Sequence, residues 1–147
     1  MNTKPLTFLL SLTFLFLFSG SVFGQETEVK KEYWDNGKLK SKTHFLNGKQ
    51  HGLKTVWYEN GQKDYELPFT NGEENGVQTA WHDNGVMESQ AVWKKGTLDG
   101  VYNRWYRNGK KMFEVYYKNG KKDGVYTQWY EDGKLQSKVT YKDDIPQ

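Results

Sequence analysis

The sequence predicts an all-β fold, an elongated antiparallel β-meander of about five 24-residue hairpin repeats in a single sheet. The first observation is that every glycine after Gly24 falls into one of three series with a 24-residue spacing. The second is that large aromatic residues recur at the same spacing. The third is that Asn-Gly pairs bound short segments rich in Val, Thr, Trp and Tyr, which are typical of β-strands. In such an array each unit contacts its neighbours only.

Residues 1–24 are expected to be a signal peptide that is not part of the fold. Lys4 precedes an apolar run from Leu6 to Phe18, and small neutral residues lead to a cleavage site before Gln25. The alternative is an uncleaved membrane anchor, but the run is shorter than the roughly 20 residues that span a bilayer. We therefore expect a secreted or periplasmic cell-envelope protein with no transmembrane segment after signal removal.

Residues 25–147 are expected to form one domain, with repeats at about 29–45, 46–69, 70–93, 94–117 and 118–141. Each unit contains two strands, such as Leu53–Tyr58 and Gln62–Phe69. The loop Glu59–Gly61 between them is expected to be a type I turn followed by a left-handed glycine. We prefer it to a two-residue type I′ turn because it would place Trp57, Tyr65 and Phe69 together on one face.

Three further expectations follow from the repeat. Because 24 is even, every unit should direct its tryptophan to the same side. The segment Thr70–Gly76 and its equivalents should be ordinary loops between hairpins. Pro68 cannot donate a hydrogen bond to a strand ladder, so we expect the strand to be bulged or to end there.

Two aromatic rows are the strongest candidate for a binding surface. A single sheet has nothing of its own to cover an apolar face, so sheet curling, a second copy or a partner must do so. The alternative is that these residues are simply core. Tyrosines on the opposite face, among charged residues, would suit protein contact or stacking on sugars. They are Tyr58, Tyr102, Tyr106, Tyr116, Tyr126 and Tyr130. The candidate binding residues are Trp57, Trp81, Trp105 and Trp129 in the first row, Phe69, Trp93, Tyr117 and Tyr141 in the second, and Tyr106 and Tyr130.

Residues for catalysis or cofactor binding are not grouped in this sequence. There is no cysteine, and His44, His51 and His82 occupy three different positions of the repeat. Asp99 and Asp123 precede glycines, which fits turn chemistry better than a calcium site. The net charge of +3 is too small to predict nucleic-acid binding. We expect no catalytic residues, no metal and no cofactor.

The segment Tyr117–Lys134 (YKNGKKDGVYTQWYEDGK) resembles MORN repeats, most closely the bacterial variant found in YwqK-like antitoxin components. The resemblance covers roughly residues 33–141. It implies a single elongated sheet of β-hairpins with a binding or scaffolding role, and the antitoxin label would imply neutralisation of a toxin.

We therefore expect a non-catalytic protein-binding or scaffolding module that is exported from the cytoplasm. Its most favoured ligand is a protein partner, which includes a second copy of the same chain. The alternative is a carbohydrate or cell-wall binding module that uses the aromatic rows. An enzyme is the least favoured hypothesis.

Overall fold

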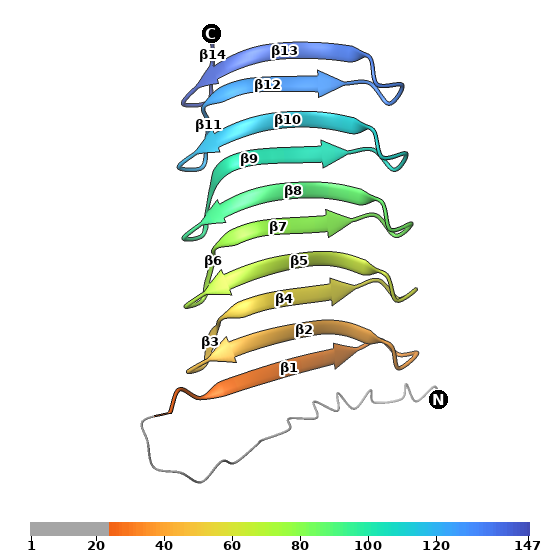
Figure 1. Ribbon diagram of the computed structural model, residues 1–147, viewed down its shortest axis with the longest axis vertical. Coiled ribbons are helices and arrows are strands. Elements are labelled where there is room, and N and C mark those ends of the chain that lie inside the picture. Colours follow the sequence, from red (N-terminus) through yellow and green to blue (C-terminus); the bar gives the residue numbers. More distant parts are fainter. Residues whose placement is uncertain (1–23) are drawn as a thin grey trace, which may run out of the picture.

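The computed structural model describes residues 24–147, so the expected signal peptide lies outside the described residues except for Gly24. The described residues form one open antiparallel sheet of 14 strands and contain no helix. The strands follow one another along the sheet in chain order (Figure 1). The predicted fold class is confirmed.

Each of the five units contributes two long strands, and short strands occur between units or after the last one. The long strands are β1 (Thr27–Tyr33), β2 (Leu39–Leu46), β4 (Gly52–Trp57), β5 (Lys63–Thr70), β7 (Gly76–Trp81), β8 (Met87–Lys94), β9 (Thr97–Trp105), β10 (Lys111–Lys118), β12 (Gly124–Trp129) and β13 (Leu135–Lys142). The two-residue strands are β3 (Lys49–Gln50), β6 (Glu73–Glu74), β11 (Lys121–Lys122) and β14 (Ile145–Pro146).

The loop within each hairpin is the predicted three-residue turn. The Gly61 N–H donates to the Tyr58 carbonyl at 2.9 Å, and the Tyr58 N–H donates to the Gln62 carbonyl at 2.9 Å. Gly61 has φ +94°, a conformation that costs energy for a residue with a side chain. The same bonds recur at Gly37, Gly85, Gly109 and Gly133.

The predicted sharing of one face by both aromatic rows is wrong. Trp57 pairs with Lys63, but Val56 pairs with Tyr65, so Asp64 is an extra residue in β5. This bulge changes the register by one residue and turns the rest of β5 over. Residues directly opposite one another share a face, and Phe69 is opposite Gly52, so Phe69 and Trp57 lie on different faces.

The same bulge occurs in all five hairpins, at Lys40, Asp64, Glu88, Met112 and Gln136. All units therefore have the same two faces, and the expectation that successive tryptophans share one side is confirmed. We call the face that carries Phe69 face A and the face that carries Trp57 face B. Tyr102 lies opposite Val115 and Tyr117 opposite Gly100, which places Tyr102 and Tyr117 together on face A.

The connection between units is not the ordinary loop that the sequence predicted. Thr70 pairs with Glu73, and the two residues between them, Asn71 and Gly72, have φ values of 54° and 94°. A two-residue loop with positive φ at both positions is a type I′ turn. The chain thus forms a second, tighter hairpin before β7 begins.

Pro68 neither bulges nor ends its strand, contrary to expectation. It pairs with Leu53 in uninterrupted register, and its carbonyl accepts a hydrogen bond from the Asn75 N–H at 2.9 Å. On the other side of β5, the ladder to β7 consists of Tyr65–Ala80 and Glu66–Thr79 only. Pro68 therefore lies where its missing N–H interrupts no pairing of that ladder.

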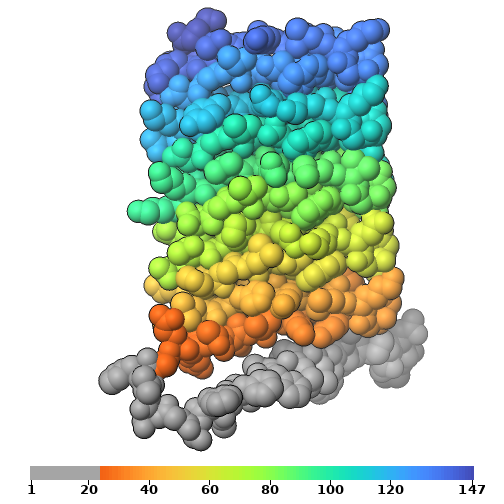
Figure 2. All heavy atoms as spheres, viewed as in Figure 1, coloured from red at the N-terminus to blue at the C-terminus, as the bar shows by residue number. Residues whose placement is uncertain are grey.

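The molecule is a thin slab, and the described residues provide no second layer over the sheet. In Figure 2 the successive units form bands from one end of the slab to the other. Among residues 24–147 three apolar side chains are buried, Phe69, Ala91 and Val115, and all three lie on face A. Val115 is only 1% exposed. These three side chains are therefore buried by neighbouring side chains of the same face, and not by a second layer.

Candidate functional site

Face B carries the tryptophan row, and lysines lie between its rings. The Lys111 Nζ is 6.0 Å from the ring centroid of Trp105 and 5.9 Å from that of Trp129. The Lys63 Nζ is 5.5 Å from the Trp81 centroid. An ammonium group in these positions is attracted by the ring electrons. The rings are partly buried, so they remain accessible for contact.

Each of these lysines is also paired with a glutamate on face B. Lys63 forms an ion pair with Glu66 at 2.7 Å, and Lys111 forms one with Glu114 at 2.6 Å. The bulge explains the geometry, because each lysine is the residue that pairs with the tryptophan just before the register changes. Face B is therefore a mosaic of indole rings and ion pairs.

A buried polar atom lies in the same face. The Asn103 Oδ1 has no hydrogen-bond partner among residues 24–147. Asn103 occupies the repeat position where the neighbouring units have Thr55, Thr79 and Thr127. Buried polar atoms are usually hydrogen-bonded, so this atom is an unfavourable feature of the isolated chain.

Face A carries the second aromatic row. Phe69, Trp93, Tyr117 and Tyr141 each lie opposite a glycine of the neighbouring strand, at Gly52, Gly76, Gly100 and Gly124. The glycines leave room above the strand, and the rings cover it. The Trp93 Nε1–H also donates to the Gln78 Oε1 at 2.8 Å.

In the C-terminal half of face A the rings touch one another. Phe113 is 5.2 Å from Tyr102 and 5.8 Å from Tyr126, measured between ring centroids. Tyr102 is 6.4 Å from Tyr117, and Tyr126 is 6.4 Å from Tyr141. The sequence assigned Tyr102 and Tyr126 to the face opposite Tyr117, so the bulge hid this cluster. We call these five residues the tyrosine cluster: Tyr102, Phe113, Tyr117, Tyr126 and Tyr141.

Tyr106, predicted as a binding residue, connects two units instead. Its hydroxyl donates to the Trp129 carbonyl of the next unit at 2.9 Å. The Tyr58 hydroxyl donates to the Trp81 carbonyl at 2.8 Å, and the Trp34 Nε1–H donates to the Trp57 carbonyl at 3.1 Å. In the third unit the His82 Nε2 lies 3.1 Å from the Trp105 carbonyl.

A second set of inter-unit hydrogen bonds comes from the hairpin turns. The amide groups of Asn60, Asn84 and Asn108 each donate to a turn carbonyl of the next unit, at Asp83, Arg107 and Glu131. Their side-chain oxygens accept from the backbone two residues later, as in the Gln62 N–H to Asn60 Oδ1 bond of 2.9 Å. The asparagine side chain thus accepts a hydrogen bond within its own turn and donates one to the turn of the next unit.

No further hairpin follows the fifth one among residues 24–147, and two residues of the fifth unit differ from their equivalents. Tyr130 is 51% exposed, and its hydroxyl has no partner among residues 24–147. The position of the asparagines is occupied by Asp132, which cannot donate. Asp132 accepts from the Lys134 N–H at 2.8 Å, and its carboxylate pairs with the Lys134 Nζ at 3.2 Å. These hydrogen bonds hold the Asp132 pKa below its usual value.

One cluster of titratable groups lies next to the Tyr58 hydroxyl. Burial and, to a smaller extent, the nearby carboxylates of Asp64 and Glu88 together raise the pKa of Tyr58 to about 12. Burial also raises the Asp64 pKa, and Glu88 contributes to this. Glu88 forms an ion pair with Arg104 at 2.7 Å.

Among residues 24–147 no group of three His, Cys, Asp or Glu residues could hold a metal ion. The His44 Nδ1 is 2.6 Å from the Leu53 carbonyl, and Asp123 pairs with Lys142 at 2.7 Å.

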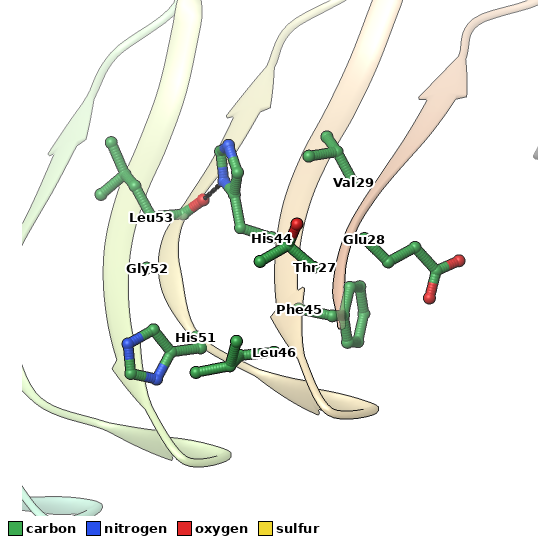
Figure 3. Close-up of a pocket in the computed structure, with 9 residues that line it drawn as sticks. All are labelled: Thr27, Glu28, Val29, His44, Phe45, Leu46, His51, Gly52 and Leu53. Atoms are coloured by element: carbon green, nitrogen blue, oxygen red, sulfur yellow. Dashed lines mark hydrogen bonds between the residues drawn. The ribbon is translucent and has the colours of Figure 1, made fainter. Parts of the chain in front are cut away.

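The first unit has an open, mostly apolar pocket of about 440 Å³ (Figure 3). It is lined by Thr27, Glu28, Val29, His44, Phe45, Leu46, His51, Gly52 and Leu53.

Comparison with known proteins agrees with the repeat geometry. No curated protein matches the chain. No helix in residues 24–147 could span a membrane. The family model described as MORN repeat variant matches residues 29–47, 50–71, 74–95, 98–119 and 122–143, which is most of the chain. Those five matches coincide with the five hairpins of the sheet, and the chain belongs to the MORN repeat variant family.

Proposed function

We propose that this protein is a non-catalytic scaffold outside the cytoplasm, and that it binds a protein partner through the tryptophan row of face B. MORN repeats are often protein-interaction modules. The observation that carries the proposal is the mosaic of Trp81, Trp105 and Trp129 with the ion pairs of Lys63 and Lys111. Tryptophan is enriched at the centres of protein interfaces, and a polar surround fixes the partner's orientation.

The same mosaic favours a protein over a carbohydrate. Sugar rings stack on open aromatic faces, whereas Lys63 and Lys111 occupy positions over three of the four tryptophan rings. A protein surface can instead offer carboxylates and carbonyls to these ammonium groups while its apolar side chains contact the indoles. No tryptophan fluorescence change is therefore expected with cell-wall glycans at about millimolar concentration, and a saturable change would favour the carbohydrate alternative.

The binding proposal is tested with Trp105→Ala on face B and Trp93→Ala on face A. The protein and both variants are used to capture proteins from the producing cell's envelope, and the captured protein is then purified for direct titration. We expect Trp105→Ala to weaken binding at least tenfold, about 1.4 kcal/mol, and Trp93→Ala to leave it within about twofold. Equal binding by folded Trp105→Ala and Trp81→Ala variants would refute the role of face B.

Export is a separate part of the proposal. It is supported by the sequence of residues 1–24 and is tested by cell fractionation with intact-mass measurement. We expect a mature chain that begins at Gln25 and is found outside the cytoplasm. A full-length chain in the cytoplasmic fraction would contradict export without affecting the binding proposal.

A further inference from the structure

Both faces carry apolar side chains, and the three buried ones lie on face A. The middle of the face is formed by Leu67, Ala91, Val115 and Val139, with the second aromatic row beside it and the tyrosine cluster over its C-terminal half. Only Phe69, Ala91 and Val115 are buried among its apolar side chains. A sheet normally buries its apolar face against a second layer, and residues 24–147 supply none.

The two halves of the array carry opposite net charge. Residues 25–93 contain eight lysines and eleven acidic residues, which gives −3. Residues 94–147 contain twelve lysines and arginines and seven acidic residues, which gives +5. The overall charge of +3 conceals this asymmetry, because the halves nearly compensate each other.

The asymmetry is present on face A itself. In the first half, Glu28, Glu32 and Glu74 lie on this face, opposite Phe45, Ser41 and Phe69. Two lysines, Lys30 and Lys54, also lie there, opposite Thr43 and Leu67, so the charged residues of the first half of face A remain acidic on balance. In the second half, Arg104 and Lys122 lie on it, opposite Phe113 and Tyr117, and Arg104 also pairs with Glu88 of β8 within the chain. No carboxylate lies on face A of the strands β9, β10, β12 and β13. The surface that best complements the basic half of face A is therefore the acidic half of the same face.

We infer that two copies of this chain pack through face A as an antiparallel dimer, with the first unit of one copy over the fifth unit of the other. A two-fold axis parallel to the strands produces this arrangement. The acidic half of each copy then faces the basic half of the other copy. A parallel arrangement would place like charges over one another. The dimer supplies the missing second layer for both sheets and leaves face B free for a partner.

The area available is sufficient for a stable dimer. Ten long strands about 4.8 Å apart extend roughly 48 Å, and strands of about seven residues extend roughly 23 Å. Face A thus has a footprint on the order of 1,000 Å² per copy. A standard protein interface buries about 800 Å² per partner.

The dimer is tested first by its mass, using sedimentation of the exported protein at about 1–100 μM. We expect a dimer whose dissociation increases in about 1 M salt, because the charge complementarity is then screened. Tyr117→Glu introduces a carboxylate into the tyrosine cluster and should give a monomer. Tyr116→Glu changes the adjacent residue, which is 41% exposed on face B, and should leave the dimer intact.

Orientation is tested by disulfide formation, since the chain has no cysteine of its own. In the antiparallel dimer, Lys30 of one copy lies near Val139 of the other. A mixture of Lys30→Cys and Val139→Cys should therefore give a cross-linked pair, and each variant alone should not. A monomer at every concentration would overturn the inference, as would a dimer that Tyr116→Glu breaks and Tyr117→Glu does not. Cross-linking of Lys30→Cys to itself would overturn the antiparallel arrangement.

Discussion

At the residue scale, one repeat position determines how neighbouring units are joined. The aromatic side chain at this position places a polar atom within 3.1 Å of the backbone carbonyl of the tryptophan in the next unit. The residues at this position are Trp34, Tyr58, His82 and Tyr106, which differ in chemistry. Side-chain chemistry at this position can vary as long as a ring of suitable length carries a hydrogen-bonding atom. The sequence shows aromatic residues here, but it does not show that their polar atoms are used within the array.

Tyr106→Phe should lower the free energy of unfolding by about 1 kcal/mol, because it removes the hydrogen bond to the Trp129 carbonyl. Tyr130→Phe is the matched control at the end of the array. Its hydroxyl has no partner among the described residues, so its stability should stay within about 0.5 kcal/mol of the parent protein. Urea unfolding monitored by tryptophan fluorescence measures both. Equal effects of the two changes would show that the inter-unit hydrogen bond contributes nothing.

Asn103→Thr should raise the free energy of unfolding by about 1 kcal/mol. The change removes a buried oxygen that lacks a partner and introduces the residue found at this position in three other units. The reverse change in another unit, Thr79→Asn, should lower stability. Thermal unfolding of both variants tests the pair, and a loss of stability in Asn103→Thr would contradict the argument.

At the element scale, the turn chemistry could be read from the sequence and the strand faces could not. Gly61 and its equivalents mark the three-residue turn, because that turn needs a positive φ. The bulges that follow have no such marker: the extra residues are Lys40, Asp64, Glu88, Met112 and Gln136, which share no size, charge or polarity. The aromatic rows were therefore found, but their division between two faces was not.

Gly100→Ala should destabilise the protein more than Gly48→Ala. Gly100 has φ +139°, and a Cβ there would lie 2.7 Å from the Val92 Cβ. Gly48 has φ +74° and nothing within 4 Å of a Cβ. The left-handed backbone alone costs about 1–2 kcal/mol with a side chain, and Gly100 adds a steric clash. The two urea midpoints measure the difference, and a larger loss for Gly48→Ala would be inconsistent with the packing of β9 against β8.

At the scale of the whole molecule, the array has no central core, and stability is distributed along it. Each long strand pairs with the strands next to it in the order of Figure 1, and β1 at the edge pairs with β2 alone. The period predicted this architecture because a recurring unit that cannot bury its own face must stack. Length and composition could not predict the charge asymmetry of face A, since it depends on which residues the bulges turn to that side.

A chain that ends at Asp123 should fold as a four-unit array. The Asp123 N–H donates to the Tyr116 carbonyl just as the Gln147 N–H donates to the Thr140 carbonyl, so the shortened chain would end in the same arrangement as the one at Gln147. The urea m-value should fall by about one fifth, since it scales with the surface exposed on unfolding. Circular dichroism and urea unfolding measure this. A chain that fails to fold would show that the last unit is indispensable.

The acid at position 132 has a consequence for how such a protein can lengthen over evolutionary time. A repeat duplicated inside the array contains its own turn asparagine and follows a unit that also has one. The turn-to-turn hydrogen bonds can therefore form on both sides of the new repeat. A segment appended after the last turn would follow Asp132, which cannot donate, and would meet Lys134 already engaged with that carboxylate. A repeat added directly after the fifth one would therefore lack the turn-to-turn hydrogen bond that Asn60, Asn84 and Asn108 form, and replacing Asp132 by asparagine would restore it.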